Sequence, residues 1–504
     1  MTLQGNAESA AGGSVPDLAE DARRWDSADG GGGDEYSVER HGRLVSASRP
    51  VADLSIERFL RAALGQERFF WRDGRQGIIL AGTGVAAHLM GYGSSRFAAI
   101  QRQAREMFSA AETGLSPRYR QAAMAELALP RLFGGFAFRE DFVPDMTWTG
   151  FHPGHFILPH YQFVAQEGHS WLTINALLSS DDEAKAVFPL LEEALDEQAG
   201  MLGRGEDGFA GQRVVADEGE IDHVQADVAI DYPLHYDDWA RLIEDARRTF
   251  ATTALQKVVL SRILQLRARH PIRISQMLTR LGAEYPDCFG FLFEPRPGHA
   301  FLGATPELLV RVQGKRLESM ALAGSIQRGK TETEDAELAA ALLASTKDRY
   351  EHALVVNALR DVLQPMCSRL TIAAEPTVLS YSNIQHLYTP VRASLEEEMG
   401  VLPLVEALHP TPAMGGTPRE LGMTFIRAHE PTLRGWYAAP VGWIDSNMEG
   451  AFAVAIRSAV VQQERAWAYS GAGIVPDSVP QAEWEETKWK FQPILRSVVG
   501  GQQV

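Results

Sequence analysis

Four runs with β-strand character follow one another between residues 257 and 313. The first, KVVLSRILQLRA, alternates in polarity, and FGFLF, AFLGA and LLVRVQ come after it. Strands joined by short turns pair as antiparallel hairpins, whereas parallel strands need crossover segments of a dozen or more residues. Two further strand patterns, AFAVAIRSAVV and RAWAYSGAGI, stand near the end of the chain. The pattern predicts antiparallel sheets with covering helices, not a doubly wound sheet.

Helical periodicity is clearest in segments that lie between the strand runs. SSRFAAIQRQAREMFSAAE (94–112) and YDDWARLIEDARRTFATTAL (236–255) are expected helices, and 334–364 is a longer helical run that Pro365 stops. Earlier in the chain, the short runs RFFW, GIIL and WLTINALL are expected strands. Helices and strands are therefore mixed along the whole chain.

Composition divides the chain into three parts. Residues 1–50 contain GGGG and much Ala, Ser, Asp and Glu, which is too little apolar surface to offset the entropy of ordering, so we expect a disordered N-terminal tail. An acidic passage that ends near Pro233 is expected to connect an N-terminal half of the fold, 51–235, to a second region, 236–504.

Charge and cysteine content exclude several classes of protein. The net charge of −17 and the lack of a Lys/Arg-rich run argue against a nucleic-acid partner. Two cysteines are too few for a disulfide framework or a cysteine-based zinc site, which favours a reducing compartment. No signal peptide and no membrane span can be recognised. We therefore expect a cytoplasmic protein without a membrane partner.

Two carboxylates continue the inward face of the helix predicted for 334–364. Its apolar stripe runs through Val355, Leu359 and Val362, and one-turn steps towards the N-terminus reach Glu351 and then Asp348. A solvated charge run is the alternative, but it would occupy the opposite face. Buried carboxylates need a cation or protons to offset desolvation.

The peptide EWEETKWK carries a second such pair. In a helix, Glu483, Glu486 and Lys490 share one face, while Lys488 points elsewhere. Taken alone, this peptide is equally typical of a solvated helix with an i,i+4 ion pair. Two helices that each present an inward carboxylate pair together suit a hard, oxygen-binding ion such as Mg²⁺.

Several features suit an anionic ligand, although each is weak alone. In YSGAGIVPDS, Gly471 and Gly473 allow backbone N–H groups to converge on an anion. Arg457, one strand earlier, is able to bind a carboxylate through two hydrogen bonds. On composition alone, Lys257 and Glu307 are indistinguishable from surface charges.

The histidine-rich segment FHPGHFILPHY raises the alternative of a zinc hydrolase. Zinc sites place their histidines on one helix face or at fixed strand ends, whereas prolines and a glycine break any helix here. Structural histidines are the preferred interpretation, and a metal assay separates the two. The histidines concerned are His152, His155, His160 and the nearby His169.

These motifs occur together in one known family. The chain resembles the chorismate-utilising enzymes and, among them, the isochorismate synthases. The resemblance covers about residues 245–498 and is carried, in family order, by KVVLSR, FLGATPELLV, LAGS, KDRYEH, NIQHLYTP, LHPTPAMGG, RGWYAAPVGWID, AIRSAVV and SGAGIVPDSVPQAEWEETKWK. It implies one α+β body with two large packed antiparallel sheets, helices outside and the active site in a cleft, with 236–504 as the chorismate-binding catalytic region.

The resemblance also implies roles for individual residues. Lys257 matches the general base that takes a proton from water, and Glu307 matches the general acid that protonates the departing hydroxyl, so Lys257 must be neutral and Glu307 protonated. The implied Mg²⁺ ligands are Glu351 and Glu486, with Asp348 and Glu483 nearby. The implied substrate-binding residues are Leu322, Gly324, Ser325, His386, Thr389, Tyr437, Arg457, Gly471, Gly473 and Lys490.

The implied reaction is the Mg²⁺-dependent isomerisation of chorismate to isochorismate by addition of water at C2 and loss of the C4 hydroxyl. Lys257 favours water over ammonia, because anthranilate synthases typically carry glutamine there. Because water is the implied nucleophile, we expect no obligatory amidotransferase partner, and no glutaminase-like nucleophile is evident in the chain itself. We also expect a monomeric enzyme. RGWYAAPVGWID resembles the menaquinone-pathway type more than the siderophore type. The alternatives are a siderophore-pathway enzyme, a salicylate synthase, an ammonia-using synthase component and a catalytically silent relative.

Overall fold

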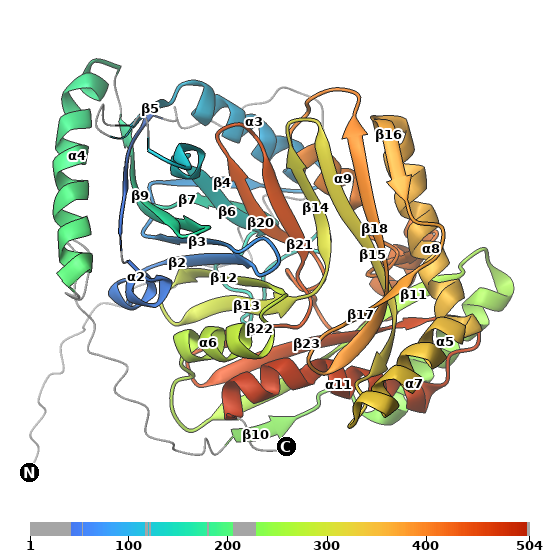
Figure 1. Cartoon of the computed structure of the whole chain (residues 1–504). Helices are drawn as coiled ribbons and strands as arrows, with labels where there is room; N and C mark the ends of the chain where they lie inside the picture. The colour runs from blue at the N-terminus through green and yellow to red at the C-terminus, as the bar shows by residue number, and fades with distance from the viewer. Residues whose placement is uncertain are drawn as a thin grey trace, which may run out of the picture. The chain divides into compact units, whose positions relative to one another are not determined.

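Two β-sheets pack against each other in the computed structural model of this chain (Figure 1). The structure describes residues 42–52, 54–115, 119, 122–178, 181–204 and 228–500. Within these residues, neighbouring strands pair antiparallel throughout, apart from β1 (Arg43–Pro50) with β5 (Glu112–Leu115), which are parallel. The antiparallel arrangement predicted from the closely spaced strand runs is confirmed.

The larger sheet draws its strands from both ends of the chain. Its central neighbours β12 and β2 pair Phe291 with Trp71, and β11 pairs with β23 over ten residue positions from Val258 to Arg267. Thirteen strands of the described residues belong to it. In spatial order they are β10 (Val228–Asp231), β11 (Lys257–Ala268), β23 (Arg465–Ile474), β22 (Ser458–Gln462), β13 (His299–Thr305), β12 (Phe289–Arg296), β2 (Arg68–Asp73), β3 (Ile78–Thr83), β8 (Tyr161–Gln166), β9 (His169–Leu178), β1 and β5, with β19 (Gly416–Thr417) beside β11.

The smaller sheet is also assembled from distant segments. β15 (Arg316–Gln327) forms its longest pairing, with β18 (Ile384–Leu395), and a register shift interrupts that pairing between Ala323 and Ser325. The other strands in the described part of the chain are β16 (Cys367–Ile372), β14 (Leu308–Gln313), β21 (Gly450–Val454), β20 (Pro440–Asp445), β6 (Arg131–Phe136), β7 (Gly154–Leu158) and β4 (Ala87–Gly91), with β17 (Thr377–Ser380) beside β18.

Helices cover the outer faces of the sheets (Figure 1). α4 packs on β1 and β9, α3 on β4, α8 on β15, and α11 on β23 and α6. Among the described residues, no helix is long and apolar enough to cross a membrane. The helices are α2 (Ile56–Ala62), α3 (Arg96–Ser109), α4 (Asp181–Arg204), α5 (Tyr236–Thr252), α6 (Ile274–Glu284), α7 (Glu332–Ala344), α8 (Thr346–Leu363), α9 (Leu402–Leu408), α10 (Arg419–His429) and α11 (Pro480–Val499), with short 3₁₀ turns at Ala125–Ala128 and Gln364–Met366.

Aromatic side chains fill the space between the sheets. Phe69 of β2 stacks on Phe133 of β6 with ring centroids 6.4 Å apart, and Phe293 of β12 meets His155 of β7 edge to face. Full burial of one such phenylalanine is worth about 1.5–3 kcal/mol. The apolar faces of the alternating strands therefore hold the two sheets together, and this packing fixes the position of the strands that carry the site.

The structure corrects two boundaries expected from the sequence. β1 begins at Arg43, inside the segment 1–50 that was expected to be a disordered tail, and residues 1–41 lie outside the described residues. The helical run expected over 334–364 is two helices, α7 and α8, because Ser345 ends the first and caps the second by accepting a hydrogen bond from the Asp348 N–H. The regions 51–235 and 236–504 both supply strands to both sheets, and Gly42–Val504 is a single unit.

Candidate active site

One pocket collects most of the predicted site residues. It lies where β11, β15, β18 and β23 approach α8 and α11. The predicted residues that line it are Lys257, Glu307, Leu322, Gly324, Ser325, Glu351, His386, Tyr437, Arg457, Gly471, Gly473, Glu486 and Lys490. Three predicted residues do not line it, namely Asp348, Glu483 and Thr389.

Lys257 stands at the first position of β11 with a fully buried side chain. Its Nζ lies 2.8 Å from Glu351 Oε1 of α8, which is an ion-pair distance, although no hydrogen-bond partner of good geometry is present among the described residues. Gly473 of β23 is close to this pair, since a Cβ on Gly473 would lie 2.3 Å from Glu351 Oε1 and 3.0 Å from Lys257 Cε. Only glycine lets the backbone approach the pair this closely.

Glu307 lies in the turn between β13 and β14 and is almost fully buried. Burial raises the pKa of its carboxyl group to about 8, even though Lys257, Arg457 and Lys490 act in the opposite direction. In the described part of the chain its Oε2 atom has no hydrogen-bond partner. At neutral pH, Glu307 is therefore mostly protonated and holds a proton that it is able to donate into the pocket.

The raised pKa of Glu307 predicts a stability difference that depends on pH. Between about 4.5, the ordinary pKa, and about 8, the folded state holds a proton that the unfolded state has lost, so the free energy of unfolding falls as pH rises. Glu307→Gln removes this titration. The variant is expected to gain several kcal/mol over wild type between pH 5 and pH 8.5, at about 1.4 kcal/mol per pH unit. Denaturant unfolding at both pH values checks this, and a pH-independent difference would contradict it.

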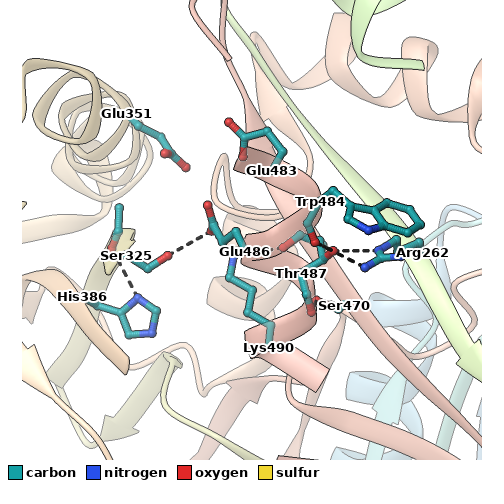
Figure 2. Close-up of polar contacts among 12 residues, drawn as sticks. Arg262, Ser325, Glu351, His386, Ser470, Glu483, Trp484, Glu486, Thr487 and Lys490 are labelled. Carbon is teal, nitrogen blue, oxygen red and sulfur yellow. Dashed lines mark hydrogen bonds and ion pairs between the residues drawn. The ribbon is translucent and has the colours of Figure 1, made fainter. Parts of the chain in front are cut away.

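Carboxylates from two helices converge beside the pocket. Figure 2 shows Glu351 of α8 and Glu483 and Glu486 of α11 extending towards the same space. Glu486 Oε1 lies 2.6 Å from Lys490 Nζ and accepts a hydrogen bond from Ser325 Oγ at 3.0 Å. Burial alone would raise the pKa of Glu486, but the Lys490 ammonium, the Lys347 charge and the Ser325 hydroxyl together outweigh it and the pKa is lowered. Glu486 is therefore ionised at neutral pH.

Asp348 and Glu483 do not line the pocket itself and have partners of their own. Glu483 Oε1 forms a 2.7 Å ion pair with Lys347 Nζ, and burial raises the pKa of Glu483, with the Glu486 charge acting in the same direction. Asp348 contacts the Ser345 hydroxyl, and burial raises its pKa as well. The sequence did not indicate Lys347 as the partner of Glu483, although it immediately precedes Asp348.

The donor set suits a hard divalent cation with few protein ligands. Within the described residues, no group of three or more His, Cys, Asp or Glu side chains is arranged to hold a metal. Mg²⁺ commonly uses only one or two carboxylates and keeps several waters, which matches Glu351 and Glu486 facing the pocket from α8 and α11. The oxygen chemistry of these two residues therefore fits Mg²⁺.

Arg457 provides a cation for an anionic ligand. It joins β21 and β22 with a left-handed φ of 52°, which is rare for a non-glycine residue and often marks a functional position. Its side chain is buried, burial lowers its pKa, and no ion pair with a carboxylate is present in the residues that the structure describes. Lys490 Nζ also donates to the Gly471 carbonyl at 3.0 Å. The pocket thus combines fixed cations with the glycine turn of β23.

His386 of β18 presents a neutral ring to the pocket. Burial lowers its pKa to about 3, and Arg457 and Lys490 act in the same direction. Its Nδ1 lies 3.3 Å from the Gly324 carbonyl, so Nδ1 is assigned as the donor and Nε2, which is buried without a partner among the described residues, as the acceptor (Figure 2). His386 is therefore able to accept a hydrogen bond from a ligand hydroxyl.

Thr389 has a different place from the one expected. Its hydroxyl lies 2.8 Å from His352 Nε2, and His352 Nδ1 in turn lies 3.2 Å from the Ala323 carbonyl. His352 follows Glu351 on α8, so Thr389 ties this helix to the sheet behind the pocket. Thr389 therefore does not line the pocket in this structure, because its side chain is turned towards α8, and its role in substrate binding stays a prediction.

Sequence reasoning missed several apolar lining residues. Val259 follows Lys257 by two positions in β11 and therefore points to the same face, so strand periodicity alone identifies it. Ala413 and Met414 belong to the quoted motif HPTPAMGG, and their position in a motif was the available signal. The pocket also includes Ala323 of LAGS and Ile456 of AIRSAVV, for which the same signal was available.

The histidines of FHPGHFILPHY lie away from this pocket. His155 of β7 approaches His88 of β4, with His155 Nε2 and His88 Nδ1 3.1 Å apart, and burial lowers the pKa of His155. His152 lies 3.3 Å from the Tyr92 hydroxyl, and His160 Nδ1 lies 2.9 Å from the Asn175 carbonyl. The rings of His152 and His88 both lie beside His155, with centroids 5.0 and 5.4 Å away, but within the described residues no group of three His, Cys, Asp or Glu side chains is arranged to hold a metal, so the zinc-hydrolase alternative gains no support.

Comparison with known proteins identifies the family. Residues 34–499 match the family described as Chorismate binding enzyme. The chain belongs to this family. Among the chorismate-binding enzymes, Isochorismate synthase MenF of Bacillus subtilis is 34% identical over 466 residues, covering 92% of this chain and 94% of the relative. A salicylate biosynthesis isochorismate synthase of Pseudomonas aeruginosa is 34% identical over 83% of each chain.

Solved structures of chorismate-binding enzymes have the same fold. The menaquinone-specific isochorismate synthase MenF of Escherichia coli aligns with a TM-score of 0.72 and 25% identity, covering 91% of this chain and 95% of the other. Component I of anthranilate synthase from Streptococcus pneumoniae aligns with a TM-score of 0.61 at 18% identity, which shows the fold alone. The predicted fold of two large, mainly antiparallel sheets with helices outside is confirmed. Enzymes of this family generally depend on a metal ion.

Proposed function

We propose that this chain is an isochorismate synthase that uses Mg²⁺ and adds water at C2 of chorismate while the C4 hydroxyl departs. The observation that carries the proposal is the pocket in which a buried lysine and a protonated glutamate, Lys257 and Glu307, face the same space. The net formula does not change, so the enzyme is an isomerase. Relatives named isochorismate synthase, similar over more than four fifths of each chain, support it.

The two proton transfers have separate residues. Lys257 takes a proton from the attacking water, and Glu307 gives its proton to the departing hydroxyl, which leaves as water. Lys257 Nζ is 2.8 Å from Glu351 Oε1, so the base role requires this contact to open and free the Nζ atom. A divalent cation held by Glu351 and Glu486 would draw electron density from the ring carboxylate and take Glu351 as a ligand. The neutral form of Lys257 stays a prediction.

The remaining lining residues bind and orient the dianion. Arg457 and the backbone N–H of Gly473 are assigned to the enolpyruvyl carboxylate, and Lys490 to a substrate carboxylate. His386 Nε2 accepts a hydrogen bond from a ring hydroxyl. Leu322 and Tyr437 close the pocket, where burial raises the pKa of the Tyr437 phenol and keeps it neutral. In this proposal the substrate carboxylates are thus bound by the cations Arg457 and Lys490.

Three further features belong to the proposal. Because the proposed nucleophile is water and not ammonia, no amidotransferase partner is required, in keeping with the relatives named isochorismate synthase. Within the chain, Cys288 and Cys367 are both buried and neither is suited to glutaminase chemistry. The menaquinone pathway is favoured because the menaquinone-specific isochorismate synthase of Escherichia coli aligns over 91% of this chain with a TM-score of 0.72, against 86% and 0.65 for a 2,3-dihydroxybenzoate-specific one. A monomer in the cytoplasm is proposed, with chorismate as the partner and neither nucleic acid nor membrane.

Metal removal tests the proposal. Purified protein with chorismate and Mg²⁺, without ammonia, is expected to form isochorismate, as identified by chromatography and mass spectrometry. EDTA is expected to abolish turnover and excess Mg²⁺ to restore it, because Glu351 and Glu486 hold the cation. Anthranilate formed only with ammonia would support the ammonia-using alternative, and salicylate with pyruvate the lyase alternative. Turnover that is unaffected by EDTA would contradict the metal assignment.

A further inference from the structure

Arg262 is a buried guanidinium that makes no direct contact with a carboxylate among the described residues, although the charge of Glu485 acts on it from further away. Its side chain on β11 is fully buried, burial lowers its pKa to about 10, and it forms no ion pair within the described residues. Its Nε donates to Thr487 Oγ1 at 2.7 Å and its Nη2 to the Trp484 carbonyl at 3.4 Å. Its Cζ lies 3.4 Å from the centroid of the Trp484 ring, with Tyr232 and Phe491 further out at 5.3 Å. Burial of an unpaired charge costs free energy, so we looked for a role of Arg262 in fixing the geometry of the residues that it contacts.

The partners of Arg262 belong to the helix that carries the site. Trp484 and Thr487 of α11 each follow a carboxylate of the site directly, Glu483 and Glu486 respectively. In Figure 2, Arg262 lies on one side of α11, and Ser325, Glu351 and His386 lie on the other. Arg262 therefore contacts neither the pocket nor any residue assigned to substrate.

A second contact holds the same turn of the helix. Ser470 of β23, which pairs with Arg262 across the sheet, donates its hydroxyl to the Thr487 carbonyl at 3.1 Å. Thr487 also donates its own hydroxyl to the Trp484 carbonyl at 2.7 Å. β11 and β23 thus hold one turn of α11 by hydrogen bonds and by the stacking of Arg262 on the Trp484 ring. Together these contacts define the rotation and the axial position of the helix.

We propose that Arg262 is a positioning residue that sets the rotation of α11 and thereby places Glu486 and Lys490 in the pocket. This inference rests on the proposed function. Only a planar guanidinium stacks on an indole while it donates in its own plane, so lysine does not replace it. A rotation of α11 by about 10° moves a group about 6 Å from the helix axis by about 1 Å. A misplacement of about 1 Å costs about 10²-fold in rate.

Arg131 offers a matched control for the loss of a buried arginine. It is buried in β6 of the smaller sheet, lies 5.3 Å from the Trp443 ring, and donates to the carbonyls of Leu127 and Leu129. It has the same kinds of contact as Arg262 but touches neither α11 nor the pocket. Arg131→Lys therefore reports what a buried arginine contributes to stability alone.

The test compares Arg262→Lys, Thr487→Val, the double variant and Arg131→Lys at a temperature well below every melting point. Arg262→Lys is expected to lower kcat/KM for chorismate by about 10²-fold, to lower kcat as well as raise KM, and to weaken Mg²⁺ binding by calorimetry about 10-fold, which is the range for residues that orient metal ligands. Thr487→Val is expected to act in the same direction. The double variant is expected to lose no more than Arg262→Lys, because both act through one contact. Arg131→Lys is expected to leave kcat/KM and Mg²⁺ affinity unchanged.

The outcomes separate this inference from the proposed function. Arg262→Lys and Thr487→Val with wild-type kcat/KM and Mg²⁺ affinity would overturn the positioning role, whatever happens to the melting temperature. If Arg262→Lys fails to fold, the milder Thr487→Val, which preserves volume, carries the same test. If wild type forms no isochorismate, the proposed function fails, and the Mg²⁺ affinities of the variants still decide the role of Arg262.

Discussion

Lys257→Ala is expected to lower kcat for isochorismate formation by about 10²–10⁴-fold, the range that a positioned general base contributes. The reason is geometric, because Lys257 is fully buried at the first position of β11 and shares the pocket with Glu307 and Arg457. The other lysine that lines the pocket, Lys490, is already engaged by Glu486 at 2.6 Å and by the Gly471 carbonyl at 3.0 Å, so it is not expected to replace Lys257 as the base. Single-turnover kinetics with saturating chorismate and Mg²⁺ measures the chemical step.

Lys488→Ala serves as the control for Lys257→Ala. Lys488 is a lysine of α11 that pairs with Glu485 at 2.9 Å on the exposed side of the helix, and exposed pairs contribute little. Lys488→Ala is expected to keep wild-type kcat and KM. A Lys257→Ala enzyme that folds and retains kcat within a few-fold of wild type would remove Lys257 from the mechanism.

Glu307→Gln is expected to produce a loss of similar size, about 10²–10⁴-fold in kcat, because an amide has the shape of the carboxyl group but no acidic proton. The pKa of about 8 predicts the sign of the pH effect. Wild-type kcat/KM is expected to fall as pH rises through about 8, since the form that carries the proton is lost there. The residual activity of Glu307→Gln is expected to lack this limb of the profile.

Glu485→Gln is the corresponding control, since Glu485 is a half-buried glutamate of α11 that lies outside the pocket. It is expected to keep both the wild-type rate and the wild-type pH profile. A pH limb near 8 that survives in Glu307→Gln would show that another group titrates. In that case Glu307 would lose the role of general acid even if its replacement slows the reaction.

The helical carboxylate pairs were predictable from the sequence because local periodicity decides which face a side chain occupies. The stripe that leads from Val355 to Glu351 predicted an inward carboxylate, and Glu351 does line the pocket. The spacing of Glu486 and Lys490 likewise predicted their shared face, and they form a 2.6 Å ion pair there. Such local patterns require only the geometry of one helix.

The pairing of distant strands was not predictable in the same way. β2 pairs with β12, and β11 with β23, over separations of about 200 residues, and no local pattern encodes such partners. The same limit applies to the contacts of Arg262. The motif KVVLSR showed a strand with an arginine, but its burial against Trp484 depends on how α11 packs on β23.

Local hydrogen bonds that compete with the sequence pattern explain where the sequence-based predictions differ from the structure. The periodicity of 334–364 continues through Ser345, yet the Ser345 hydroxyl caps the next helix, and capping outweighs continuation of the pattern. Thr389 lies in the correct strand but turns towards His352, because a buried hydroxyl needs a hydrogen-bond partner. The start of β1 at Arg43 was missed because RLVSASRP was grouped with the polar residues before it.

The source of the C2 hydroxyl oxygen tests the central claim most directly. Chorismate and Mg²⁺ are incubated with the enzyme in ¹⁸O-labelled water, and the isochorismate is analysed by mass spectrometry with fragmentation. The account predicts one ¹⁸O atom in the product, located in the hydroxyl group at C2, because Lys257 activates a solvent water while Glu307 releases the original C4 oxygen. Isochorismate whose C2 hydroxyl group contains unlabelled oxygen from chorismate would contradict water addition and the roles of both residues.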